Sequence, residues 1–137
     1  MNQSAQPLVV RSDRDGITTL ALNRPEALNA LSPSLFEELQ SHLTNIANTP
    51  EETGVVILTG NGRSFSAGND LKAIEKGEKA ATPYQQAETL DFIERMPQPV
   101  IASVRGHCYT GALELAIACD LLICSEDARF CDTHGKW

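Results

Sequence analysis

The feature that most restricts the fold of this chain is residues 54–60, Gly-Val-Val-Ile-Leu-Thr-Gly, a largely apolar and β-branched run between two glycines. Because β-branched residues favour extended backbone and glycines interrupt it, this run predicts a strand. An apolar strand without polar alternation is typical of a parallel sheet that is covered on both faces. We therefore expect this strand in the interior of an α/β fold.

The segments before this strand predict a hairpin and a helix. Residues 8–11 and 17–22 predict two short strands, and Asp-Gly at 15–16 predicts the turn that joins them. Ser-Pro at 32–33 predicts a helix start, since a serine hydroxyl caps free N–H groups and proline suits the first helical position. Four apolar residues follow at helical spacing and would face a core: Leu35, Leu39, Leu43 and Ile46.

The segments after it continue the alternation. Residues 61–79 are polar and contain glycines, which predicts an irregular segment. Thr-Pro at 82–83 predicts the start of a second helix, which must end near Met96 because two prolines follow. Apolar runs at 100–104 and 121–124 predict further strands. Strands that alternate with helices indicate an α/β fold with mainly parallel pairing.

The composition and net charge restrict the kind of protein and the binding partners that we expect. The 137 residues suit one domain, and 42% apolar with 21% charged residues is typical of a globular chain. A net charge of −7 argues against nucleic acid or an anionic membrane as a partner, since both need a basic face. Residues 1–10 have no secretory pattern, and no apolar run approaches the roughly 20 residues of a membrane span. We therefore expect a cytoplasmic protein.

The cysteines are consistent with that location. All four lie within 24 residues of one another, and none forms a C-x-x-C pair. Reduced core thiols of a cytosolic protein are favoured over a disulfide framework, and the spacing does not favour a metal site. The cysteines are Cys108, Cys119, Cys124 and Cys131.

Glu114 is the most informative single residue. It is the only carboxylate in residues 111–119, an otherwise apolar run that predicts a compact helix. Burying a carboxylate costs free energy, and proteins accept that cost mostly where a proton must move. The alternative is a first-turn glutamate that faces solvent and complements the helix dipole.

Two further features could form a ligand site with Glu114. Gly111 begins the same helix, where N–H groups lack helical partners and could stabilise an oxyanion; otherwise the glycine serves only the turn. Residues 64–71, Ser-Phe-Ser-Ala-Gly-Asn-Asp-Leu, follow the strand at 54–60. Loops at this end of parallel strands bind ligands in α/β folds. Neither a phosphate loop nor a G-x-S-x-G serine elbow is present in the sequence.

Three blocks together resemble the enoyl-CoA hydratase/isomerase (crotonase) superfamily. They are Asn-Arg-Pro-Glu-Ala-Leu-Asn-Ala-Leu at 23–31, the loop at 64–71, and residues 99–120 with Gly106, Gly111 and Glu114. The resemblance implies a spiral of repeated strand-strand-helix units and a single crotonase-like domain over 1–137. Family chains continue further, so we expect the C-terminal part to be missing and apolar surface to be exposed. The full-length form would be a homotrimer or hexamer.

The resemblance also implies a site for an acyl-CoA thioester. Backbone N–H groups of Ala67 and Gly111 would bind the thioester carbonyl, and Glu114 matches the first of two catalytic glutamates of the hydratases. The adenine end of CoA would lie around residues 27, 28 and 30, and the thioester along residues 67–70. No cofactor is implied, because coenzyme A is part of the substrate. The implied substrate-binding residues are Ala27, Leu28, Ala30, Ala67, Gly68, Asn69, Asp70, Leu71 and Gly111.

His134 departs from the hydratase pattern. The second hydratase glutamate lies twenty residues after the first, and His134 occupies that position here. Imidazole can donate or accept a proton, so His134 is a further catalytic candidate. Two functions stay open: an enoyl-CoA hydratase/isomerase-type lyase of fatty acid metabolism, or a non-catalytic acyl-CoA binding protein. A serine peptidase of the same fold is less favoured, because no serine has a suitable context.

Overall fold

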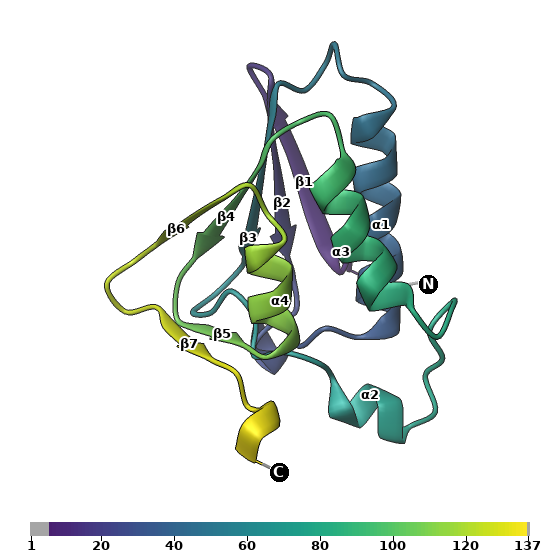
Figure 1. Cartoon of the computed structure of the whole chain (residues 1–137), viewed down its shortest axis with the longest axis vertical. Helices are drawn as coiled ribbons and strands as arrows, with labels where there is room; N and C mark the ends of the chain where they lie inside the picture. Colours follow the sequence, from purple (N-terminus) through teal and green to yellow (C-terminus); the bar gives the residue numbers. More distant parts are fainter. Residues whose placement is uncertain (1–5, 137) are drawn as a thin grey trace.

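A five-stranded sheet organises the molecule, in the order β1-β2-β3-β4-β6 (Figure 1). The computed structural model describes residues 6–136. β1 is antiparallel to β2, and the other neighbouring strands are parallel, as the sequence predicts. β5 and β7 form a separate parallel pair. The strands are β1 (Val9–Arg14), β2 (Ile17–Leu22), β3 (Val55–Gly60), β4 (Val100–Val104), β5 (His107–Tyr109), β6 (Leu121–Cys124) and β7 (Arg129–Cys131).

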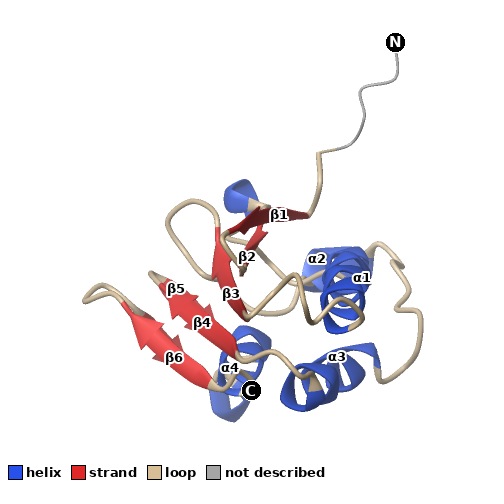
Figure 2. Ribbon diagram, turned by 90° about the horizontal axis from the view of Figure 1, so that it is seen from above, coloured by secondary structure: helices blue, strands red, loops and turns tan. Residues whose placement is uncertain are grey.

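Helices α1, α3 and α4 lie on the same side of the sheet (Figure 2). β3 and β4 therefore bury alternate residues against the helices and leave the others half-buried. This corrects the prediction that the strand at 54–60 is covered on both faces, because within residues 6–136 no helix covers its second face. The helices are α1 (Pro33–Ala47), α2 (Leu71–Glu75), α3 (Gln85–Arg95) and α4 (Gly111–Ile117), with 3-10 turns η1 (Pro25–Ala27) and η2 (His134–Lys136).

The core lies between α1 and the β2–β4 part of the sheet. The predicted apolar face of α1 is fully buried, and it meets Leu20, Leu22 and Leu58 in one cluster. Ser32 caps α1 as predicted, since its hydroxyl accepts the Leu35 N–H at 3.2 Å. α3 ends at Arg95, where the following prolines predict a helix end. These elements hold the sheet end that carries the site.

Three element boundaries differ from the sequence predictions. β1 continues to Arg14, because the hairpin pairs every residue up to the turn. The segment at 61–79 contains the short helix α2, whose start is capped by the Asp70 carboxylate. α3 begins at Gln85 rather than directly after Pro83, and Tyr84 precedes it as an exposed residue.

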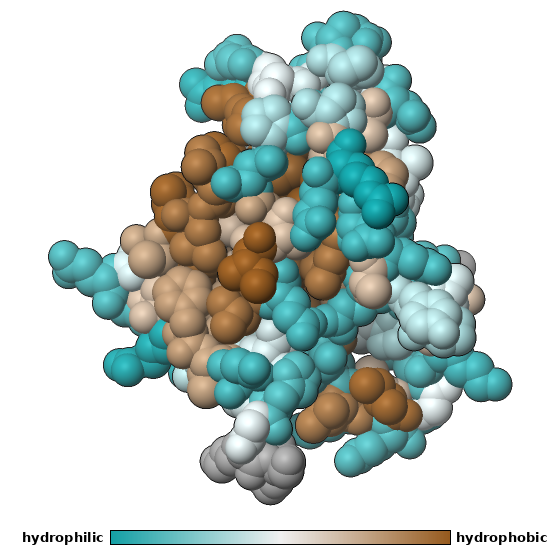
Figure 3. All heavy atoms as spheres, in the orientation of Figure 1, coloured by the Kyte–Doolittle hydropathy of each residue, from teal (hydrophilic) through white to brown (hydrophobic). Residues whose placement is uncertain are grey.

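The edge strand β6 of the sheet is not covered by other described elements. Leu121 and Ile123 are 61% and 59% exposed, and all four residues of β6 are exposed. Figure 3 shows hydrophobic side chains gathered on the side of the molecule where Figure 1 places β6. The expectation of exposed apolar surface is confirmed. Among the described residues, no helix has the length and apolar character to cross a membrane.

The cysteines are all free thiols, as expected from their spacing. Cys108 is buried and Cys119 is half-buried, whereas Cys124 and Cys131 are exposed. Burial raises the pKa of the Cys108 and Cys119 thiols to about 12. The first two thiols are therefore core groups in an apolar environment. The prediction of core thiols is wrong for Cys124 and Cys131, because the strands that carry them, β6 and β7, are exposed.

Candidate active site

The loop at 64–71 is fixed between two other predicted site segments. Leu31 donates its N–H to the Gly68 carbonyl at 2.8 Å and accepts the Asp70 N–H at 2.9 Å. On its other side, Ser66 pairs with Cys108 of β5. The three sequence blocks, distant along the chain, therefore meet at one end of the sheet.

Gly111 packs directly against this loop. A Cβ at this position would collide with Asn69 Oδ1 and lie 3.2 Å from Gln86 Nε2. Only glycine lets the start of α4 approach these two side chains so closely. Within residues 6–136, the backbone N–H groups of Gly111 and Asn69 have no hydrogen-bond partner. Two free donors thus lie on neighbouring segments, where a ligand oxygen could accept both.

Ala67 does not provide the second donor that the resemblance implies. Its N–H donates to the Leu28 carbonyl oxygen at 2.9 Å and is therefore occupied. Ala67 and Asp70 donate their N–H groups to residues of segment 28–31, whereas the N–H of Asn69, which lies between them, makes no such hydrogen bond. The free N–H therefore belongs to Asn69. Sequence reasoning could name the loop, but the direction of each N–H depends on pairing register.

Thr110 fixes the entry into α4. Its backbone has a φ of 50°, a left-handed conformation that is rare for a β-branched residue. The Thr110 N–H donates to the Cys131 carbonyl oxygen at 2.8 Å, and its hydroxyl hydrogen-bonds with the Thr133 hydroxyl. The strand β7 and the residues after it thereby hold the strained backbone next to Gly111.

Glu114 lies one turn after Gly111 and is half-buried. Its carboxylate accepts a hydrogen bond from Gln86 Nε2, on α3. The carboxylate is therefore partnered, in contrast to the unpaired group that the apolar run suggests. Together with apolar residues of the α3 start, such as Ala87 and Leu90, it lines a hollow of about 390 Å³.

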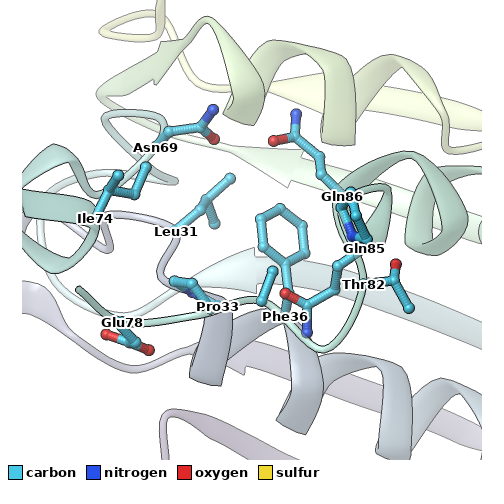
Figure 4. A pocket seen from close by; sticks show the side chains of 11 residues that line it. Leu31, Pro33, Phe36, Asn69, Ile74, Glu78, Thr82, Gln85 and Gln86 are labelled. Atoms are coloured by element: carbon cyan, nitrogen blue, oxygen red, sulfur yellow. The ribbon is translucent and has the colours of Figure 1, made fainter.

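A second hollow, of about 340 Å³, begins at the same place (Figure 4). Leu31 and Phe36 lie in its middle, and Asn69 and Gln86 extend toward each other at one end. Its apolar walls could hold a hydrocarbon group whose polar end reaches the free N–H groups. The apolar lining residues are Leu31, Pro33, Phe36, Ile74, Ala80 and Pro83.

A third hollow, of about 470 Å³, contains most of the predicted CoA-binding residues. It also contains Lys72 and Lys76, one turn apart on and after α2, which the sequence predictions omit. Lysines with this spacing so close to a ligand loop could have signalled an anion site. The predicted residues found there are Ala27, Ala30, Asn69, Asp70 and Leu71.

Asp70 has a structural role at this hollow. Its carboxylate accepts the Ala73 N–H at 3.0 Å and lies 2.7 Å from Arg24 Nη1. Burial alone would raise the pKa of Asp70, but these hydrogen bonds and the charge of Arg24 hold that pKa below its ordinary value. Gly68, with a φ of 97°, fits closely against the Tyr109 carbonyl oxygen. Both residues shape the loop.

His134 lies at the edge of this arrangement. Its side chain is 63% exposed, and its Nδ1 is 2.9 Å from the Asp132 carboxylate. The preceding residue, Thr133, hydrogen-bonds to Thr110 beside Gly111. The chain therefore brings residue 134 near the site, while the imidazole is paired at the surface. Its catalytic role stays a prediction.

The site thus combines a hydrogen-bonded carboxylate with two free backbone N–H groups at one end of an α/β sheet. Residues 12–136 match the family model described as enoyl-CoA hydratase/isomerase. The chain therefore belongs to the enoyl-CoA hydratase/isomerase family, as the resemblance indicates.

Relatives and solved structures agree with the family model. The chain is 35% identical over 128 residues to "Probable enoyl-CoA hydratase 1, peroxisomal" of Arabidopsis thaliana, and the matched region covers 93% of this chain and 48% of that protein. It is 34% identical over 145 residues to the human mitochondrial Delta(3,5)-Delta(2,4)-dienoyl-CoA isomerase, covering 94% of this chain and 43% of that one. A solved enoyl-CoA hydratase/isomerase of Xanthobacter autotrophicus superposes with a TM-score of 0.86 and 35% identity, over 94% of this chain and 50% of that one. The chain thus has the crotonase fold and spans about half the length of these proteins.

Proposed function

We propose that this protein binds acyl-CoA thioesters and catalyses a hydratase- or isomerase-type reaction on an enoyl-CoA. The observation that carries the proposal is the pair of free N–H groups of Asn69 and Gly111, together with the Glu114 carboxylate one helical turn after Gly111. A thioester carbonyl oxygen that accepts both hydrogen bonds gains negative charge easily. Backbone donors of this kind stabilise the enolate that forms when a proton leaves the α-carbon or when water adds to the β-carbon.

Glu114 is the group that moves the proton. In isomerisation it would take a proton from one carbon of the acyl group and return it to another, while the π electrons shift between the carbons. In hydration it would accept a proton from water as the water oxygen bonds to the β-carbon, and the same carboxyl group would then pass that proton to the α-carbon of the enolate. The hydrogen bond from Gln86 leaves the second carboxylate oxygen for these transfers.

The remaining hollows supply binding. The apolar hollow around Leu31 and Phe36 would hold the acyl group, since it starts beside Asn69. Lys72 and Lys76 would face the phosphates of CoA next to Ala27 and Ala30, because ammonium groups bind phosphate as point charges. No metal or redox cofactor is part of this proposal.

One observation favours the alternative of an acyl-CoA binding protein without turnover. Hydration in the hydratases uses two glutamates, whereas the residue at the second position is His134, whose imidazole is exposed and paired with Asp132. Binding of acyl-CoA with no hydration and no proton exchange would select this alternative.

The experiment that tests the proposal compares wild type with Glu114→Gln in the protein as its gene encodes it. The amide keeps the size and hydrogen bonding of the carboxylate but cannot exchange a proton. Removal of a general acid/base lowers kcat by about 10²- to 10⁴-fold, and acyl-CoA affinity should stay nearly unchanged. Glu94→Gln, at an exposed position of α3, is the matched control. Equal enoyl-CoA turnover by wild type and Glu114→Gln would refute the role of Glu114.

A further inference from the structure

Gln86 occupies the junction of the site. Its side chain lines both the apolar hollow around Phe36 and the hollow that contains Glu114. Its Nε2 donates to Glu114 Oε2, and the same nitrogen would lie 3.2 Å from a Cβ on Gly111. One amide therefore touches the proposed acid/base and borders the start of α4.

The chemistry of this contact suits orientation rather than proton transfer. A carboxamide does not titrate near neutral pH, so Gln86 can donate a hydrogen bond without adding charge or competing for the proton. A glutamate side chain loses rotamer freedom when it is held in one geometry. A donor fixed on α3 can hold Oε2, and in the described part of the chain Oε1 has no hydrogen-bond partner.

The position of Gln86 links this orientation to the acyl group. The residue lies at the start of α3, and Figure 4 shows its amide directed toward Asn69 across the end of the apolar hollow. An acyl group in that hollow, with its carbonyl oxygen on the Asn69 and Gly111 N–H groups, would pass alongside Gln86. The Gln86 side chain would then contact both the acyl group of the substrate and the Glu114 carboxylate that acts on that group.

We propose that Gln86 is a positioning residue that aims the Glu114 carboxylate at the acyl carbons next to the thioester. This inference rests on the proposed function. A positioning residue acts on the rate of the chemical step, because a displacement of about 1 Å at the reacting group can cost on the order of 10²-fold. It has little effect on ground-state binding.

The test uses Gln86→Met, which keeps the length and most of the volume of the side chain but cannot donate a hydrogen bond. Gln40→Met, the same change on α1, is the control. The readouts are exchange of the α-protons of a saturated acyl-CoA with deuterated water, turnover of an enoyl-CoA, and the Kd of the saturated acyl-CoA. Proton exchange needs Glu114 and the carbonyl donors, and it does not need a second carboxylate.

We expect Gln86→Met to lower the exchange rate and kcat by about 10- to 100-fold, with Kd, KM and melting temperature unchanged. In the Glu114→Gln background the same change should have no further effect on rate, since Gln86 acts through Glu114. Equal rates for Gln86→Met and wild type, or an equal loss in both backgrounds, would overturn the role of Gln86 and leave the proposed function intact. Wild-type protein that binds acyl-CoA but exchanges no α-proton would overturn both.

Discussion

The inner strands of the sheet and its edge strand β6 differ in how far they are covered. Leu20 of β2 and Leu58 of β3 are completely buried in one core cluster with the apolar face of α1, whereas Leu121 and Ile123 of β6 are mostly exposed. The site follows this division. Gln86 and Glu114 are half-buried, and hydrogen bonds to Leu31 hold the loop that contains Asn69, whereas His134 follows β7, whose residues are exposed. Tertiary contacts thus fix the groups proposed to act on the thioester, while the predicted role of His134 has no such support.

Thiol reactivity should show the largest contrast. Burial raises the pKa of Cys108 and Cys119 to about 12, so at pH 8 their thiolate fraction is roughly 10³-fold below that of an ordinary thiol. Cys124 of β6 and Cys131 of β7, which are both exposed, should react first with iodoacetamide. Peptide mass mapping of a time course measures this order. Rapid labelling of Cys108 in folded protein would show that β5 is open to solvent.

Core truncation measures the same contrast in stability. Leu58→Ala should lower the unfolding free energy of the 137-residue chain by about 2–5 kcal/mol, because it leaves a cavity in a fully buried site. Leu121→Ala should change it by no more than about 0.5 kcal/mol. Urea unfolding followed by circular dichroism measures both, after wild type shows a cooperative transition. Equal losses would mean that another segment or a second chain covers β6.

Gly111→Ala tests the close contact inside the site. The added methyl group collides with Asn69 Oδ1, and such overpacking costs about 1–3 kcal/mol. We expect acyl-CoA affinity to fall by about tenfold through displacement of Asn69 or α4. Gly135→Ala is the control at an exposed glycine, where a Cβ meets no atom within 4 Å in the described chain. Calorimetric titration of both variants decides the matter, and unchanged affinity in Gly111→Ala would contradict the tight approach.

The smallest effect concerns pH. The pKa of Asp70 is lower in the folded state than in the unfolded state, so its ionised form stabilises the fold at pH values above about 4. This contribution disappears as the pH falls through the lowered pKa. Asp70→Asn should therefore be less stable than wild type at pH 7, and the difference should vanish in acid. Melting curves between pH 7 and pH 2.5 measure it, and a difference that does not shrink as the pH falls would exclude the carboxylate as its source.

The sequence predicts the fold well where local signals and burial agree. The Ser32 cap and the apolar face of α1 are both confirmed, and each depends on short-range patterns. The prediction that residues 54–60 are covered on both faces is wrong, because the strand pattern does not show on which side the helices pack. The choice of Ala67 fails for a related reason, since only the pairing with Leu28 shows which N–H is free.

The hydrogen-bond partner of Glu114 could not be predicted from the sequence either. Gln86 is 28 residues away on another helix, and no spacing rule connects a lone glutamine to a carboxylate in a later helix. Lys72 and Lys76, in contrast, carry a readable signal, because two lysines at helical spacing directly follow the predicted ligand loop. The residues that a tertiary contact brings together are those that sequence reasoning misses.

The most direct test of the central claim is the vibrational frequency of a bound thioester carbonyl. A saturated acyl-CoA carrying ¹³C at the thioester carbonyl is measured by infrared difference spectroscopy, free in water and bound to the protein. Two backbone donors aimed at the carbonyl oxygen weaken the C=O bond more than water does, so the account predicts a lower stretching frequency in the complex. A bound thioester whose carbonyl frequency equals or exceeds that in water would contradict the assignment of Asn69 and Gly111 as the carbonyl site.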